Sequence, residues 1–197
     1  MSIEDSLSLL LGHNHGYFTT KEAAAQGIDR WTLTRLVQDG KIARVAQGLY
    51  THPDAFPDPF VVTQHRCAIG VFSHETALYL HDLSDRLPLQ LMMTIPSGWN
   101  SPLLKDDGLV FFYNKKAWFE MGLSSVQTKA GPQVRCYDVE RTLCDCIRSI
   151  DRLDRDMAIT AMKSYMRQPG RNRAKLLEYA DVFGIRDTMY HYMEVLS

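Results

Sequence analysis

The residues with the clearest potential for chemistry lie in one short segment, residues 29–39. At about 100° per residue in a helix, Trp31, Arg35 and Gln38 fall on one side, opposite the leucines and the valine of the segment. In the major groove of DNA, an arginine can form two hydrogen bonds to guanine and a glutamine can pair with adenine. The spacing therefore predicts a recognition helix for DNA.

Other side chains extend this surface on both sides of the helix. Arg30 and the first amides of the helix suit a phosphate group, and the hairpin expected after the helix can follow the DNA backbone. A second interpretation stays open, in which Trp31 packs against the rest of the chain and Arg35 pairs with Asp39 one turn on. The predicted DNA-contacting residues are Thr20, Arg30, Trp31, Thr32, Thr34, Arg35, Gln38, Lys41, Arg44 and Gln47.

Several catalytic patterns can be compared with the sequence and rejected. The histidines of His74-Glu75 and His81 are seven residues apart, whereas the zinc-protease motif needs a spacing of four. The chain has no Gly-x-x-x-x-Gly-Lys phosphate loop, and its serines lack a nucleophile-elbow sequence. We therefore expect no catalytic residue, no metal site and no cofactor.

Two further charged groups invite a functional interpretation. In the Asp138–Thr142 stretch, we expect Asp138 to cap a helix and Arg141 to pair with Glu140 or Asp145, which is a structural role. The second group is a set of basic side chains within a run that has no acidic residue. It predicts either a solvated helix end or a second basic surface for DNA or a partner. Its members are Lys163, Arg167, Arg171, Arg173 and Lys175.

The elements that position the predicted DNA-contacting residues follow one another in a recognisable order. Residues 5–12 predict a helix capped by Asp5 or Ser6, and residues 19–27 a helix with a Thr19–Glu22 capping box. Asp29 can cap the third helix, and residues 41–51 have the alternation of a hairpin anchored by Tyr50. Three short helices followed by a hairpin are typical of a winged helix-turn-helix. A stiff proline-rich connector follows, and we place the domain boundary there, with the DNA-binding domain at residues 1–58.

The remainder, residues 59–197, alternates in type and predicts an α+β domain with a small sheet and a helical tail. Expected strands are residues 89–95, 109–113 and 134–137. Expected helices are residues 60–70, 73–81 (capped by Ser73), 139–150, 155–167, 173–183 and 186–196.

Charge and composition limit these interpretations. The chain of 197 residues has a net charge of −1, so any DNA binding must depend on where the charges lie. No apolar stretch is long enough to cross a bilayer, and the acidic start is unlike a signal peptide, so we expect a cytoplasmic protein without a membrane partner. The four cysteines are expected to be reduced core residues.

Several runs, taken together in their order, resemble the AbiEi family of antitoxins from type IV toxin–antitoxin systems. They are Gly16-Tyr-Phe-Thr-Thr-Lys-Glu-Ala, Gly27-Ile, Leu36-Val, Gly40-Lys-Ile, Gly48-Leu-Tyr, Phe72-Ser-His-Glu-Thr-Ala-Leu-Tyr-Leu-His-Asp-Leu, Thr94-Ile-Pro and Val139-Glu-Arg-Thr-Leu. The resemblance implies a winged-helix repressor that binds inverted repeats in its own promoter. It also implies a C-terminal domain that counteracts an AbiEii-type nucleotidyltransferase toxin in abortive infection, a form of phage defence. Gln47 departs from the family, because many relatives carry arginine there.

Three functions therefore compete. The first is an antitoxin and autorepressor, expected to be a monomer in solution that places two copies on paired DNA sites; whether it touches the toxin directly stays open. The second is a plain winged-helix regulator whose C-terminal domain senses a small ligand. The third is an enzyme that modifies a partner protein, which the missing catalytic pattern disfavours.

Overall fold

The computed structural model describes residues 2–99 and 108–196. The chain divides into two compact units: unit 1 comprises Met1–Ala68 and Gln127–Val134, and unit 2 comprises Ile69–Val126 and Arg135–Ser197. The helix that begins at Pro59, directly after the boundary expected at residue 58, is thus grouped with unit 1.

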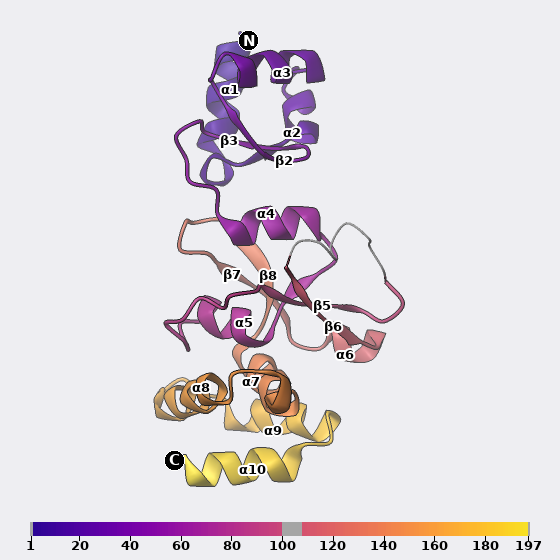
Figure 1. Cartoon of the computed structure of the whole chain (residues 1–197), viewed down its shortest axis with the longest axis vertical. Coiled ribbons are helices and arrows are strands. Elements are labelled where there is room, and N and C mark those ends of the chain that lie inside the picture. The colour runs from indigo at the N-terminus through magenta and orange to yellow at the C-terminus, as the bar shows by residue number, and fades with distance from the viewer. Residues whose placement is uncertain (1, 100–107, 197) are drawn as a thin grey trace. The chain divides into compact units, whose positions relative to one another are not determined.

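Unit 1 consists of short helices and a small antiparallel sheet (Figure 1). The strand order is β1-β3-β2, so β3 lies between the other two. Because β1 is only two residues long, it has no alternation that the sequence could have revealed. The elements are α1 (Ile3–Gly12), η1 (Asn14–Gly16), β1 (Phe18–Thr19), α2 (Thr20–Ala25), α3 (Arg30–Gln38), β2 (Ala43–Ala46), β3 (Leu49–Thr51) and α4 (Pro59–Arg66).

Side-chain caps fix where the first helices begin. The expected caps Thr19 and Asp29 are confirmed, since each accepts a hydrogen bond from a backbone amide in the first turn of its helix. The expected cap of α1 was wrong. Ser2 caps that helix, and Asp5 is the return partner of Ser2 in a capping box, so α1 starts earlier than its apolar pattern indicates.

The core of unit 1 joins the helices to the sheet. Leu33 and Leu36 of α3 are buried, as the helical spacing predicts. The ring of Tyr50 in β3 stacks on Phe18 with 5.6 Å between centroids, which confirms Tyr50 as an anchor of the hairpin. The remaining buried members of this core are Leu7, Leu10, Ala23, Ile28 and Ile42.

Unit 2 contains a mixed sheet with the strand order β6-β5-β4-β8-β7. The segment that joins β7 to β8, residues 127–134, is grouped with unit 1. β4 pairs antiparallel with β5 and parallel with β8, while β5 and β6 are parallel. The expected strands are present within a few residues, whereas β4 and β7 were missed. Their bounds are β4 (Val71–Phe72), β5 (Met92–Pro96), β6 (Val110–Asn114), β7 (Leu123–Gln127) and β8 (Gln133–Tyr137).

In the helical tail of unit 2, α7 packs against α8 and α9, and α10 also packs against α8 and α9 (Figure 1). The core of this tail contains Cys144 and Cys146, and all four cysteines of the chain are buried, as expected. The helices are α5 (His74–Leu80), α6 (Lys116–Glu120), α7 (Val139–Arg148), η3 (Ile150–Arg152), α8 (Arg155–Arg167), α9 (Arg173–Val182) and α10 (Arg186–Val195).

A buried ion pair organises the start of α7. Asp138 caps this helix, and Arg141 Nε donates to Asp145 Oδ2 at 2.9 Å, with both side chains inaccessible to solvent. The structural interpretation of this stretch is therefore confirmed. Ser73 is the N-cap residue of α5, as expected, but its hydroxyl bonds to Thr94 and His74 and makes no capping hydrogen bond.

Within residues 2–99 and 108–196, no helix is both long and apolar enough to cross a membrane.

Candidate nucleic-acid interface

The third helix carries most of the predicted reading residues on its exposed side. Trp31 is 70% exposed although it is the largest side chain of the helix. Arg30, Thr34, Arg35 and Gln38 are exposed as well, and Thr32 is half-buried. A large aromatic ring that is exposed to water forgoes the free energy that its burial would provide. Such a ring on an ordered helix is therefore typical of a contact surface.

Arg35 links the two ends of this surface. Its Nε lies 3.7 Å from Asp39 Oδ2, and its guanidinium carbon lies 6.0 Å from the centre of the Trp31 ring. The pairing with Asp39 was the alternative interpretation, and it is present. However, exposed pairs one helical turn apart contribute only about 0.3–0.5 kcal/mol, so Arg35 can leave Asp39 for a stronger acceptor.

Asp29 sets the start of this helix and its electrostatics. The carboxylate accepts a hydrogen bond from the Thr32 amide at 2.8 Å, and this bond lowers the pKa of Asp29 below its ordinary value. Asp29 thus stays ionised and occupies amides that a phosphate would use. The Thr34 hydroxyl donates to the Arg30 carbonyl at 3.0 Å, so it is turned back toward its own helix.

The β2–β3 hairpin carries the other predicted contacts. Arg44 and Gln47 are exposed, while Val45 between them is half-buried, in agreement with the expected alternation. A register shift between Arg44 and Ala46 bends the strand, and Arg44 Nε donates to the Ala46 carbonyl at 3.4 Å. Arg44 is therefore held close to the hairpin turn.

Neighbouring elements fix the position of the hairpin turn. The Thr20 amide donates to the Gly48 carbonyl at 3.0 Å, and a Cβ at Gly48 would lie 3.3 Å from the Thr20 hydroxyl. Gly48 also has a φ of +74°, which favours glycine. Thr20 thus supports the turn, and its hydroxyl is half-buried.

Two contacts were invisible in the sequence. His65 of α4 lies with Nε2 3.0 Å from the Gln47 carbonyl oxygen, and Lys41 forms an ion pair with Glu4 of α1 at 3.3 Å. Both link residues far apart in the chain, so no local pattern reports them. The pair with Glu4 partly neutralises Lys41 at the edge of the surface.

The second basic run is less uniform than its sequence indicates. Lys175 Nζ lies 3.0 Å from Asp138 Oδ2 and 3.6 Å from Glu140 Oε2, so its charge is matched within unit 2. Lys163, Arg167 and Arg173 are exposed and Arg171 is half-buried. These four cations remain available as a surface.

Within residues 2–99 and 108–196, no group of three or more His, Cys, Asp or Glu side chains could hold a metal ion.

The N-terminal segment is similar to a family of transcriptional regulators. The family profile described as "Transcriptional regulator, AbiEi antitoxin" matches residues 6–53, which confirms the AbiEi resemblance over the three helices and the hairpin.

The fold can be compared over a longer part of the chain. The crystal structure of the RV2827C protein from Mycobacterium tuberculosis is similar with a TM-score of 0.51 at 12% sequence identity, over 96% of this chain and 78% of that one. At this identity, the likeness shows the mixed α+β fold alone. No protein with a curated description matches the chain.

Proposed function

We propose that unit 1 is a winged helix-turn-helix that binds operator DNA, with α3 as the recognition helix and the β2–β3 hairpin as the wing. The observation that carries this proposal is the exposure of Trp31, Arg35 and Gln38 on one ordered helix, together with the exposure of Arg44 and Gln47 on the hairpin that follows it. The match of residues 6–53 to a transcriptional regulator family supports it.

The AbiEi resemblance extends the proposal to an autorepressor and antitoxin. The protein binds inverted repeats upstream of its own operon, and its C-terminal part counteracts a co-encoded nucleotidyltransferase toxin. A small basic surface on one protomer provides few phosphate contacts, so a monomeric protein needs two copies on paired sites for firm binding.

Titration of the upstream DNA with the purified protein tests DNA binding. Arg35→Ala should weaken operator binding by about 1–3 kcal/mol and relax sequence preference, because it removes a base contact. The matched control is Lys116→Ala on α6, which removes an exposed cation whose partner is Glu120. Unchanged operator affinity in Arg35→Ala, or an equal loss in Lys116→Ala, would remove Arg35 from the reading surface.

The second candidate is a regulator whose unit 2 senses a small ligand. The observation that favours it is a cavity of about 480 Å³ between β6 and the end of α7. A ligand that changes operator affinity at fixed salt would separate this function from that of a plain autorepressor.

A further inference from the structure

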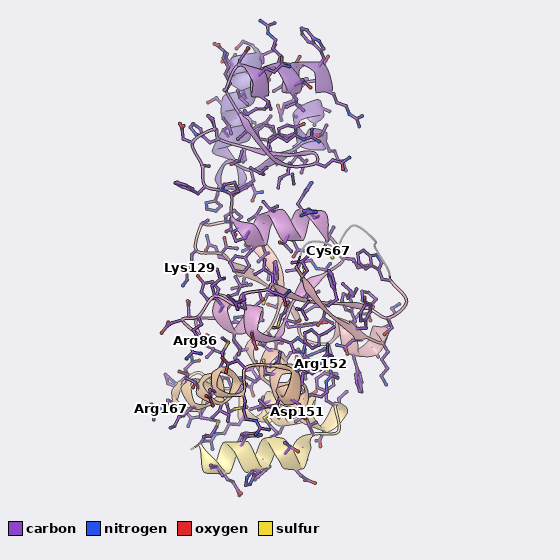
Figure 2. The ribbon with its side chains drawn as sticks, viewed as in Figure 1. Cys67, Arg86, Lys129, Asp151, Arg152 and Arg167 are labelled. Atoms are coloured by element: carbon purple, nitrogen blue, oxygen red, sulfur yellow. The ribbon has the colours of Figure 1, made fainter. Side chains whose placement is uncertain are left out.

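The cavity of unit 2 has the size and the lining of a ligand site. Its volume of about 480 Å³ lies within the range of about 300–1,000 Å³ that small-molecule sites occupy. Two residues of β6, the end of α7 and η3 form its wall. Figure 2 labels two of the lining residues, Asp151 and Arg152. The lining residues are Phe112, Tyr113, Arg148, Ser149, Asp151 and Arg152.

Arg152 offers a cation without a protein anion. Its guanidinium carbon lies 4.7 Å from the centre of the Phe112 ring, and within residues 2–99 and 108–196 it forms no ion pair. Asp151, the carboxylate in the lining, is 89% exposed and pairs instead with Arg155 at 3.5 Å. Arg152 is therefore free to bind an anion from solution.

Arg148 is a second cation with a fixed orientation. Its Nη2 donates to Asn114 Oδ1 and to Asp145 Oδ1, both at 3.2 Å, and its side chain is 21% exposed. A guanidinium held in this way loses little conformational entropy when it binds an oxyanion with its other nitrogens. Asp145 also pairs with Arg141, so a single carboxylate is shared between two arginines.

Ser149 adds a hydroxyl that a buried imidazole orients. The Nε2 atom of His74 lies 3.3 Å from Ser149 Oγ, and the His74 ring stacks on Phe112 with 3.4 Å between centroids. Burial, together with Arg148, Arg141 and Arg152, holds the pKa of His74 well below its ordinary value. The imidazole is therefore neutral, and the three arginines make the region electropositive.

Two aromatic residues of β6 belong to the lining, and they differ in exposure. Phe112 is buried and already contacts His74 and Arg152. Tyr113, the next residue, is 56% exposed although it lines the same cavity. Stacking of a base on such a ring contributes about 1–3 kcal/mol.

We propose that this cavity binds a mononucleotide, with its phosphate on Arg148, Arg152 and Ser149 and its base stacked on Tyr113. Two guanidiniums and a hydroxyl match the oxygens of a phosphate, and an exposed aromatic ring matches a base. The inference does not depend on the proposed DNA binding, because every residue involved belongs to unit 2.

Calorimetric titration of the full chain with AMP, ribose 5-phosphate and inorganic phosphate tests the site. AMP should bind most tightly, and Arg152→Ala should weaken AMP binding about tenfold or more. Tyr113→Ala should weaken AMP binding while ribose 5-phosphate binding stays unchanged. The matched control is Arg167→Ala, an exposed arginine of α8 away from this cavity, which should bind AMP like the wild type (Figure 2).

Three results would overturn the proposal. They are no saturable binding of AMP, equal weakening in Arg167→Ala and Arg152→Ala, and equal affinity for AMP and inorganic phosphate. Because Arg152 and Tyr113 are both exposed, their variants should keep the thermal unfolding midpoint of the wild type, which a melting curve checks. AMP binding and operator binding are measured separately. A failure of the mononucleotide proposal can therefore be distinguished from a failure of the proposed DNA binding.

Discussion

His74 shows how one residue combines backbone strain with burial in unit 2. Its φ of +51° lies in the left-handed region, which costs energy for a side chain with a Cβ. The imidazole is inaccessible to solvent and bonded through Nδ1 to Ser73 Oγ at 2.9 Å and through Nε2 to Ser149. These contacts offset the strain and fix the ring against Phe112.

The low pKa of His74 predicts a dependence of stability on pH. The imidazole stays neutral in the folded protein but takes up a proton in the unfolded chain below about pH 6.5. Protonation therefore favours the unfolded state, and stability falls as the pH drops below that value. Between pH 7 and pH 5.5, the wild type should lose about 1 kcal/mol more than His74→Asn, a variant that tolerates positive φ.

Urea unfolding of both proteins at the two pH values measures this difference. All other titrating groups are common to the two chains, so the comparison isolates His74. Parallel losses in the wild type and the variant would show that His74 is not kept neutral by the fold.

Sequence spacing predicts the contact of a residue well where both partners lie within one turn of the same helix. The pair Arg141–Asp145 and the cap Asp138 were predicted in this way and are present. The cavity could not be predicted, because Phe112 and Arg152 are separated by the helix α6, the β7–β8 hairpin and the helix α7. Such a site exists only after long-range packing.

At the scale of elements, caps and apolar periodicity predicted most of the helices and most of the longer strands, whereas the short helix α6 was missed. The missed strands β1 and β4 have two residues each, too few to show a period of two. β7 was missed for a different reason: four of its five residues are exposed, so the strand lacks a buried face. Pairing with neighbouring strands determines these elements, and pairing is not a local property.

The capping box of α2 gives a prediction at this scale. Thr19 Oγ1 accepts from the Glu22 amide at 3.2 Å, and the Glu22 carboxylate accepts from the Thr19 amide at 2.6 Å. Thr19→Ala should lower the free energy of unfolding by about 1 kcal/mol, because it leaves a helix amide without its partner. Urea unfolding measures the loss, and Thr19→Ser, which keeps the hydroxyl, is the control.

A loss of equal size in Thr19→Ser would mean that the methyl group, and not the cap, stabilises the helix. Because Thr20 bonds to Gly48 at the hairpin turn, weakening α2 should also loosen the hairpin. Faster exchange of the Thr20 amide, which donates this hydrogen bond, in Thr19→Ala would report this coupling.

At the scale of the whole molecule, a net charge of −1 cannot attract DNA by itself. The DNA binding that we propose must come from a few exposed groups in unit 1, and part of the charge of unit 1 is already matched, as in the pair of Lys41 with Glu4. Strong salt dependence and weak binding by one protomer follow from such a surface. The remaining functions, including action against a toxin, are assigned in our proposal to other parts of the chain.

This division of labour predicts a separation of functions in the full chain. The double variant Arg35→Ala, Gln38→Ala removes two exposed side chains of α3 and leaves the buried Leu33 and Leu36 in place, so the fold should persist. Repression of a reporter behind the native promoter should be lost, while growth protection against the co-encoded toxin stays at the wild-type level. Lys116→Ala should keep both functions. If protection were lost together with repression in a variant that still melts like the wild type, the antitoxin action would require the DNA-reading surface.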